Sequence, residues 1–350
     1  MTKYTVAQVG CGGRGHRHIE GFLRNPDRFD LVAICDLDRE RLDATADTFA
    51  IPRRYTDADA MLGEVKPDVF CFVTQPAARL ELVELGVRHG VRAIAFEKPM
   101  ATSLAEAHAI VSLCDSAGVK AIVSHQQKYG PQWQKAKAVV DSGAIGDVVR
   151  IHASARAWLM QLGTHIVDYL MWFNGGRRAE WVVGHLHGAE HLADSHPSPD
   201  YILGEIAFEN GLRAFVESGY LSPQWLGDDR FWTDNRITVY GTHGYAWANT
   251  DGGWAAFTKE SGGEVIGEQL AQWGEQEREL LQAPYLRELA DWLDDDARPH
   301  SCNAAISYHG LEILTGLCLS ALEHRRVDLP VAEIPGETVL ERIARELLPR

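Results

Sequence analysis

The chain has 350 residues, of which 45% are hydrophobic, and a formal net charge of −15 at pH 7. A chain of this length and composition can bury sizeable cores and is expected to divide into about two domains. The negative charge, without a dense cluster of Lys and Arg, disfavours nucleic acid and anionic membranes as partners. We therefore expect a small-molecule partner.

Two features favour a cytoplasmic location. No uninterrupted apolar run approaches the roughly 18 residues of a membrane span, and residues 1–5 lead into a predicted strand without a signal-peptide core.

The six cysteines are scattered without a CxxC pair, so we expect reduced, structural thiols. They are Cys11, Cys35, Cys71, Cys114, Cys302 and Cys318.

The first 125 residues alternate short apolar runs with longer amphipathic ones, the pattern of parallel strands joined by crossover helices. Helices are predicted at about 15–24, 39–49, 78–89 and 103–117. Strands are predicted at Thr5–Val9, Leu31–Cys35, Val69–Thr74, Ala93–Phe96 and Ala121–Ser124. Because most of these strands are apolar throughout, both sheet faces should be covered, as in a doubly wound Rossmann domain over residues 1–125.

The pattern changes after residue 125, and residues 126–350 are predicted to form a second domain. A helix opens it, and an alternating strand follows at Val148–Ser154. Further strands are predicted at 180–187, 202–208, 212–219 and 236–240. Hairpin-like connections such as Glu209–Gly211 favour a largely antiparallel, open sheet, and the helical tail from Pro284 to Glu323 makes this an α+β domain.

A glycine-rich segment follows the first predicted strand and precedes the first predicted helix, and it matches the GxGxxG pattern. Glycines allow a tight turn and close approach of the backbone to a pyrophosphate, and the helix N-terminus supplies amides and a positive dipole. Asp36 ends the second predicted strand, where a carboxylate can bind both ribose hydroxyls. The cofactor residues predicted on these grounds are Gly10, Gly12, Gly13, Arg14, Gly15 and Asp36.

Asp36 favours NAD over NADP, because its charge would repel a 2′-phosphate on the ribose. NADP stays the less favoured alternative, because Arg39 or Arg41 could reach such a phosphate. Both arginines are more readily interpreted as solvated helix residues.

By the fifth predicted strand the sequence resembles a known family. The run Ala95–Pro99 is similar to the Glu-Lys-Pro signature of the glucose-fructose oxidoreductase/inositol dehydrogenase (Gfo/Idh/MocA) family. The resemblance covers nearly the whole chain, and its further segments are Thr74–Pro76, Lys128–Pro131, Gly163–Asp168 and Ser320–Pro330. It implies an NAD(P)-dependent oxidoreductase acting on a sugar or polyol. It also implies cofactor contacts from Thr74, Gln75, Pro76, Glu97 and Lys98.

Lys98 follows a parallel strand, at the carboxyl edge where open α/β sheets bind ligands, and Pro99 fixes the chain beyond it. An ammonium there can hydrogen-bond the reacting hydroxyl, lower its pKa and stabilise alkoxide charge. The resemblance implies this role for Lys98 near the nicotinamide, with Glu97 nearby.

His165 lies in a segment, Trp158–Phe173, whose apolar positions recur at helical spacing, and Asp168 follows one turn later on the same face. Imidazole can accept a hydroxyl proton while hydride moves to the cofactor. The resemblance implies that His165 is the catalytic histidine. Many members have Asp four residues earlier, whereas Gln161 stands here. His165 is therefore expected to be a weaker base, to take its orientation from Asp168, or to serve an altered reaction.

Further side chains are predicted to border the substrate by position and resemblance. Three of them follow the last predicted strand of the first domain, and Trp158 precedes His165 on the same segment, where its ring could stack on a sugar. The predicted substrate residues are His125, Gln126, Tyr129, Trp158, Gln161 and Asp168.

No metal site is predicted. His185 and His187 have the spacing of two ligands on one side of a strand, but no Cys or HExxH partner accompanies them. Arg79 stands where the family commonly has His, which blurs any assignment of the particular substrate.

The sequence therefore predicts a sugar or polyol dehydrogenase that uses NAD, with Lys98 polarising the hydroxyl and His165 taking its proton. One alternative is a glycoside-cleaving branch of the family with tightly held, recycled NAD. The other is a non-catalytic nucleotide-binding sensor, which Gln161 motivates. The open face of the second sheet, rich in Val, Ile, Trp and His, is expected to pack against another subunit in a homodimer or homotetramer.

Overall fold

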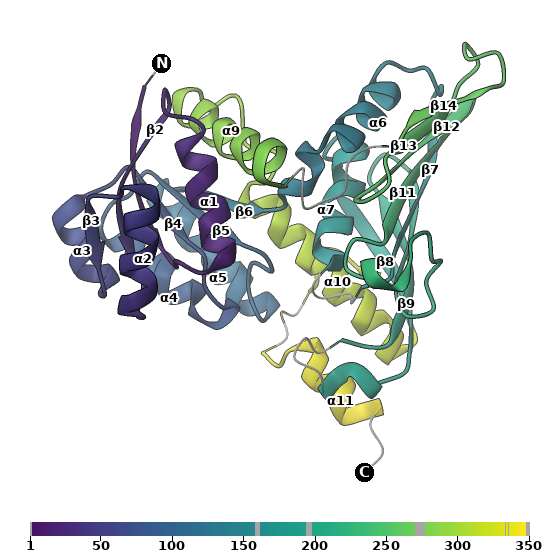
Figure 1. Ribbon diagram of the computed structural model, residues 1–350. Coiled ribbons are helices and arrows are strands. Elements are labelled where there is room, and N and C mark those ends of the chain that lie inside the picture. The colour runs from purple at the N-terminus through teal and green to yellow at the C-terminus, as the bar shows by residue number, and fades with distance from the viewer. Residues whose placement is uncertain are drawn as a thin grey trace. The chain divides into compact units, whose positions relative to one another are not determined.

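The computed structural model describes residues 2–157, 162–193, 198–269, 277–332, 334 and 336–347. The chain folds into two compact units (Figure 1). The first unit comprises residues 1–102, 106–126 and 277–308, and the second comprises residues 103–105, 127–276 and 309–350.

The first unit is built on a six-stranded sheet in the order β3-β2-β1-β4-β5-β6, and all neighbouring strands are parallel. The strands are β1 (Tyr4–Val9), β2 (Phe29–Cys35), β3 (Arg53–Tyr55), β4 (Val69–Phe72), β5 (Ala93–Glu97) and β6 (Lys120–Ser124). The helices are α1 (Gly13–Leu23), α2 (Arg39–Phe49), α3 (Ala58–Val65), α4 (Arg79–Arg88), α5 (Leu104–Ala117) and α9 (Gln282–Asp294). This order is that of a doubly wound Rossmann fold, which confirms the predicted fold class.

Strands β4 and β5 are buried along their whole length, and the rings of Phe72 and Phe96 stack with centroids 5.1 Å apart. Continuous apolar sequence in these strands is therefore explained by cover on both faces. All six cysteines lie buried without a disulfide, as predicted.

The sequence pattern did not reveal β3 and α3. Strand β3 has three residues, two of them exposed arginines, and it pairs only with β2 at the sheet edge. Such a short, charged edge strand has no apolar alternation to detect. Helix α3 begins where the Asp57 carboxylate accepts a hydrogen bond from Ala60 N at 3.0 Å, a normal N-cap.

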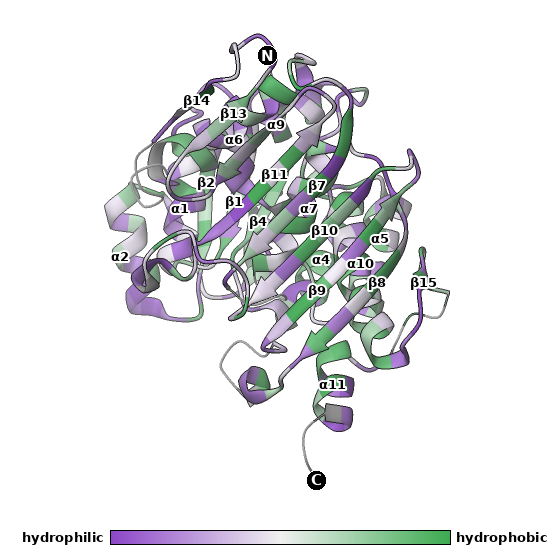
Figure 2. Ribbon diagram, turned by 90° about the vertical axis from the view of Figure 1, so that its right-hand side faces the viewer, coloured by the Kyte–Doolittle hydropathy of each residue, from purple (hydrophilic) through white to green (hydrophobic). Residues whose placement is uncertain are grey.

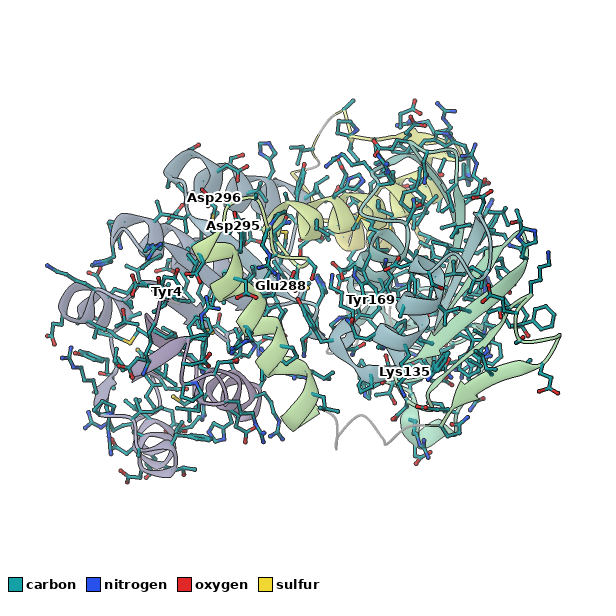
Figure 3. All side chains as sticks on the ribbon, turned by 90° about the horizontal axis from the view of Figure 1, so that it is seen from above. Tyr4, Lys135, Tyr169, Glu288, Asp295 and Asp296 are labelled. Atoms are coloured by element: carbon teal, nitrogen blue, oxygen red, sulfur yellow. The ribbon has the colours of Figure 1, made fainter. Side chains whose placement is uncertain are left out.

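Helix α9 belongs to the first unit, although the sequence pattern placed its residues in the second domain. It packs beside α1 (Figure 1), and Figure 3 labels Glu288 on it. A Cβ added at Gly21 would lie 2.7 Å from Gln282 Cγ, so glycine allows the two helices to approach closely. The buried Arg28 guanidinium also donates to Asp294 on α9 at 2.7 Å. Local periodicity cannot reveal such contacts between distant segments.

The second unit contains a nine-stranded sheet in the order β14-β13-β12-β11-β7-β10-β9-β8-β15. Its pairs are antiparallel except β7 with β10, so the predicted largely antiparallel sheet is confirmed. Its strands are β7 (Val148–Ala155), β8 (Ala179–His187), β9 (Tyr201–Phe208), β10 (Arg213–Gly219), β11 (Asn235–Gly241), β12 (Gly244–Asn249), β13 (Trp254–Phe257), β14 (Val265–Glu268) and β15 (Val327–Asp328). Among the described residues, the remaining α-helices are α6 (Pro131–Asp141), α7 (Thr164–Phe173), α10 (Ala304–Glu323) and α11 (Val339–Leu347).

The predicted hairpin joins β9 to β10 through Asn210 and Gly211. Gly211 has a φ of +83° and donates its amide to Phe208 O at 2.8 Å. Positive φ at this position is what an Asn-Gly hairpin turn requires. Strands β12 to β14 were not predicted, because several of their positions are Gly or Ala and give little apolar alternation.

Helices cover one face of this sheet. Helix α10 approaches β8 and β9 closely, because a Cβ on Gly184 would lie 2.2 Å from Leu317 O and one on Gly204 would lie 2.4 Å from the Leu317 side chain. Ser320 Oγ also accepts a hydrogen bond from Gly184 N at 3.0 Å. By length and composition α10 could cross a membrane, but 72% of its apolar window is buried inside the structure, as in a core helix.

The opposite face of the sheet is turned toward the viewer in Figure 2, where polar and apolar residues alternate along the strands. It carries more arginine than the prediction assumed. Arg236 lies between the rings of Trp225 and Trp247, at 3.7 and 4.1 Å from their centroids. Arg150 lies 4.5 Å from the centroid of the Tyr240 ring. Stacked Arg and aromatic side chains are therefore part of this face.

Candidate functional site

The glycine-rich loop connects β1 to α1. A Cβ on Gly10 would lie 2.3 Å from Val73 O, and one on Gly15 would lie 2.2 Å from Gly10 O, so both positions need glycine. A Cβ on Gly12 or Gly13 would meet nothing within 4 Å, and no side chain caps α1. The open backbone and uncapped helix N-terminus fit the pyrophosphate of a dinucleotide.

Asp36 is buried at the end of β2. Its carboxylate accepts hydrogen bonds from Cys11 N at 2.8 Å and Asp38 N at 2.9 Å, which fix it beside the glycine loop. Each carboxylate oxygen can accept further hydrogen bonds, so ribose hydroxyls fit this position. Arg41 Nη1 lies 3.5 Å from Asp36 Oδ1, whereas Arg39 pairs with Asp43 at 3.0 Å. Arg41 is thus the arginine near the predicted ribose position.

The remaining predicted residues of the first unit follow its parallel strands. Parallel strands end at one edge of a sheet, so these segments share an edge with the glycine loop and Asp36. Thr74, Gln75 and Pro76 follow β4, Glu97 ends β5 and Lys98 follows it, and His125 and Gln126 follow β6. This unit therefore gathers the predicted cofactor residues with Lys98.

Two side chains of the first unit, His18 and Arg14, contact the Glu97 carboxylate. His18 Nε2 donates to Glu97 Oε1 at 3.0 Å, and Gln282 Nε2 donates to His18 Nδ1 at 3.0 Å. Arg14 Nε lies 3.8 Å from the same carboxylate. Burial would raise the pKa of Glu97, but the hydrogen bond from His18 and the Arg14 charge outweigh it and hold the pKa at about 2. Glu97 is therefore a fixed negative charge next to Lys98.

Lys98 is half-buried, and burial lowers the pKa of its ammonium. The Glu97 carboxylate opposes this shift, and the positive charges of Arg14 and Arg79 add to it. Burial likewise lowers the pKa of Arg79 to about 10. Arg79 Nη2 donates to Lys98 O at 3.2 Å and thereby links α4 to the segment after β5.

His165 and Asp168 lie on α7 in the second unit, and both are buried. Asp168 Oδ2 accepts a hydrogen bond from Lys128 Nζ at 2.8 Å, so these residues form a buried ion pair. His165 Nδ1 lies 2.9 Å from the Tyr169 hydroxyl, one turn further along the helix. Figure 3 labels Tyr169 within this unit. Tyr129, half-buried, precedes α6 in the same unit.

Tyr169 was not among the predicted site residues, and neither was its second contact, Gln127. Tyr169 follows His165 by four residues, the spacing at which side chains on a helix meet, so this spacing could have revealed Tyr169 in the sequence.

Trp158 and Gln161, two predicted substrate residues, lie outside the described residues. His185 and His187 are exposed on β8, and among the described residues no group of three or more potential ligands could hold a metal ion.

Comparison with known proteins gives two family-model matches. Residues 4–125 match a model described as an oxidoreductase family with an NAD-binding Rossmann fold, and residues 155–247 match the GFO/IDH/MocA C-terminal domain. The first unit is therefore the NAD-binding Rossmann domain of an oxidoreductase family. Since both models describe one family, the chain belongs to the Gfo/Idh/MocA family, as the sequence motifs predicted.

Individual relatives match this chain in sequence over part of its length. A D-apiose dehydrogenase from Paraburkholderia graminis is 38% identical over 146 residues, which are 42% of this chain and 38% of the relative. An inositol 2-dehydrogenase from Salmonella typhimurium is 23% identical over 41% of this chain and 43% of its own length. The match thus spans less than half the length of these relatives.

The fold similarity extends further than the sequence similarity. The crystal structure of an oxidoreductase from Agrobacterium radiobacter in complex with NAD+, L-tartaric acid and magnesium has a TM-score of 0.78 and 22% identity. It covers 93% of this chain and 98% of that one. The two-domain architecture is therefore shared over almost the whole length.

Proposed function

We propose that this protein is an NAD-dependent oxidoreductase that transfers hydride between a carbinol of a sugar or polyol and the nicotinamide. One observation carries the proposal: Lys98 follows β5 in the same sheet whose β1 and β2 end at the glycine loop and Asp36. The names of the relatives, a D-apiose and an inositol dehydrogenase, support a sugar or polyol as substrate. The sequence-derived cytoplasmic location is retained as part of this proposal.

In this proposal the chain's own residues bind the cofactor and move the hydroxyl proton. The amides of the glycine loop hold the pyrophosphate, and Asp36 accepts hydrogen bonds from the ribose. The Lys98 ammonium donates to the substrate oxygen and stabilises its developing negative charge, for which a lowered pKa makes it a stronger donor. His165 accepts the hydroxyl proton. NAD, when bound, supplies the hydride acceptor.

A turnover screen tests this function. The purified protein would be incubated with NAD or NADP and a panel of sugars and polyols, and reduced cofactor would be measured. Net formation of reduced cofactor with at least one compound is expected. Cleavage of a glycoside without net reduced cofactor would instead indicate the glycoside-cleaving branch. Cofactor binding without turnover of any compound would favour a nucleotide sensor.

NAD is expected to bind more tightly than NADP, because the Asp36 carboxylate repels a 2′-phosphate. Asp36→Ala should lower the ratio of the NADP to the NAD dissociation constant by about tenfold or more, which corresponds to about 1.4 kcal/mol. Arg41→Ala in that background should weaken NADP again, because Arg41 is the nearby cation. Calorimetric titration of both cofactors measures these changes, with Asp59→Ala on α3 as the exposed control. Tighter NADP binding by the unmodified protein would contradict the assignment.

Self-association is expected through the uncovered sheet face. Aromatic and Arg side chains, which this face presents as stacked pairs, are enriched at the centres of protein interfaces. Light scattering at micromolar concentration should give the mass of a dimer or tetramer. Leu203→Glu should lower that mass, because Leu203 is 40% exposed on β9 and its replacement would place a charge in the contact. A monomer mass for the unmodified protein would exclude this role of the face.

A further inference from the structure

We propose that Gln8 is a positioning residue for the cofactor, because its side-chain amide holds the glycine loop in the shape that binds the pyrophosphate. Gln8 lies on β1, two residues before Gly10, and was not among the predicted site residues. The inference rests on the part of the proposed function in which the glycine loop holds the pyrophosphate. It concerns residues of the first unit only.

The Gln8 amide connects the two ends of the loop. Its Nε2 donates to Gly10 O and to Gly15 O, at 3.0 Å in both cases. Both neighbours are carbonyl oxygens, which only accept hydrogen bonds, so the end of the side chain that faces them is the NH2 group. That group has two hydrogens, one for each carbonyl. One side chain therefore joins the residue that begins the loop to the first turn of α1.

The two carbonyls lie where the loop folds back against the helix. A Cβ on Gly15 would lie 2.2 Å from Gly10 O and 3.3 Å from Gln8 Nε2, so loop and helix are in contact at this point. Gly10 N also donates to Cys35 O at 2.8 Å, which fixes the start of the loop to the end of β2. Residues 11–14, which lie between the two carbonyls, are therefore fixed at both ends.

The place of Gln8 in the sheet favours a role beyond packing. Its side chain is fully buried, at 0% exposure, on a strand that lies between β2 and β4. A buried amide costs free energy unless hydrogen bonds compensate for it, and an apolar side chain would fill the same place without that cost. The amide is therefore explained by the two loop carbonyls to which it donates.

A loop that is already fixed loses less conformational freedom when a ligand binds, which raises the affinity. The backbone at Gly12 and Gly13 is open and no side chain caps α1, so amides and the helix dipole can act on the phosphates. Without Gln8, the loop would have to adopt this shape during binding. Gln8 should therefore affect the phosphate part of NAD and leave binding of the adenosine part, at Asp36, unchanged.

Gln8→Met tests this, because methionine is also unbranched and of similar length but has no N–H donor, and Gln8→Leu is a second apolar replacement. Both variants should bind NAD and ADP-ribose about tenfold or more weakly, since both ligands contain the pyrophosphate. Adenosine, which lacks phosphates, should bind the variants and the unmodified protein equally. Calorimetry measures NAD and ADP-ribose, and saturation-transfer NMR measures adenosine. An unchanged affinity for ADP-ribose, or an equal loss for adenosine, would overturn the inference.

Asn25→Leu is the matched control for lost stability. Asn25 is also a buried amide, 3% exposed, and its Nδ2 donates to two backbone carbonyls, Gly21 O and Ala283 O, both at 2.9 Å. These carbonyls lie on α1 and α9 and not on the glycine loop. Asn25→Leu and Gln8→Met should both unfold at a lower temperature, but only Gln8→Met should lose affinity for ADP-ribose. Equal losses of affinity would mean that binding merely follows stability, which contradicts a specific role for Gln8.

Gln8→Glu adds a readout that lost packing would not change. A buried carboxyl beside two carbonyl oxygens should have a raised pKa, because its charged form is disfavoured there. When protonated it has one O–H to donate to the loop, and when charged it has none. Gln8→Glu should therefore bind ADP-ribose more weakly than Gln8→Met at about pH 8 and more tightly at about pH 5. If Gln8→Glu bound no more tightly than Gln8→Met at the lower pH, the donor would have no role.

Failure of the proposed function has a different signature. The affinities are measured without a sugar or polyol, so a protein that reduces no cofactor in the turnover screen would still show the loss in Gln8→Met. If the unmodified protein bound ADP-ribose no more tightly than adenosine, the glycine loop would not hold the pyrophosphate. The inference would then fail together with that part of the proposed function.

Discussion

Lys98→Ala and His165→Ala should each lower kcat by about 10²- to 10⁴-fold, the range typical for loss of a group that donates or accepts a proton in the transition state. Lys98 would no longer stabilise the alkoxide, and without His165 the proton would have no positioned acceptor. NAD affinity should remain nearly unchanged, because the glycine loop and Asp36 are intact in both variants. Steady-state kinetics and calorimetry together separate the two effects.

Matched controls exist in each unit. Lys66→Ala removes an exposed lysine that follows α3, and His243→Ala removes an exposed histidine between β11 and β12. Neither control should change kcat by more than about twofold, as expected for surface substitutions far from special features. Full activity in both Lys98→Ala and His165→Ala would refute the catalytic assignment, whatever the cofactor measurements show.

Lys128→Met should lower the free energy of unfolding by about 3–5 kcal/mol, the usual effect of removing one partner from a buried ion pair. The side chains of Lys128 and Asp168 are 2% and 1% exposed, so the remaining carboxylate would lie buried without its ammonium partner. Urea unfolding followed by tryptophan fluorescence measures the loss. The double variant Lys128→Met, Asp168→Leu should recover part of it, because neither charge then remains.

Lys135→Met is the control for this experiment. Lys135, labelled in Figure 3, pairs with Glu268, and their side chains are 42% and 49% exposed. An exposed ion pair contributes about 0–1 kcal/mol, so the control should unfold at nearly the same urea concentration as the unmodified protein. Equal destabilisation by the two substitutions would mean that burial of the Lys128 pair has no special effect.

Much of the fold was predictable, because strands covered on both faces and strands covered on one face differ in their pattern of apolar residues. Buried strands such as β4 and β5 are apolar throughout, and β7 alternates as a half-covered strand does, so each indicated its own kind of sheet. Strand β3 could not be found this way, because exposed arginines at a sheet edge need no apolar partner. The contact of α9 with α1 depends on packing between residues far apart in sequence, which periodicity does not encode.

The site was predictable where a motif has a local physical cause. Gly10 and Gly15 are required by backbone contacts within one turn, and Asp36 lies at a strand end that the sequence pattern located. The partners of α7 were less accessible. Tyr169 shares a helix face with His165, and its hydroxyl also contacts the amide oxygen of Gln127. The same oxygen accepts a hydrogen bond from Thr250, which lies 123 residues further along the chain. Only the fold brings these groups together.

Helix α9 completes the first unit, but it is translated only after residues 127–276 of the second unit. Residues 127–276 are an insertion within the first unit, so translation releases all six strands of the Rossmann sheet long before α9. Until α9 emerges from the ribosome, its carboxylates Asp291 and Asp294 cannot pair with the Arg28 guanidinium, and the Gly21 face of α1 is not covered by Gln282. Domains generally fold as units during translation, so the first unit of this protein completes its folding after most of the second has been made. The nascent chain therefore passes through an extended interval in which chaperones and proteases can reach an unfinished nucleotide-binding domain.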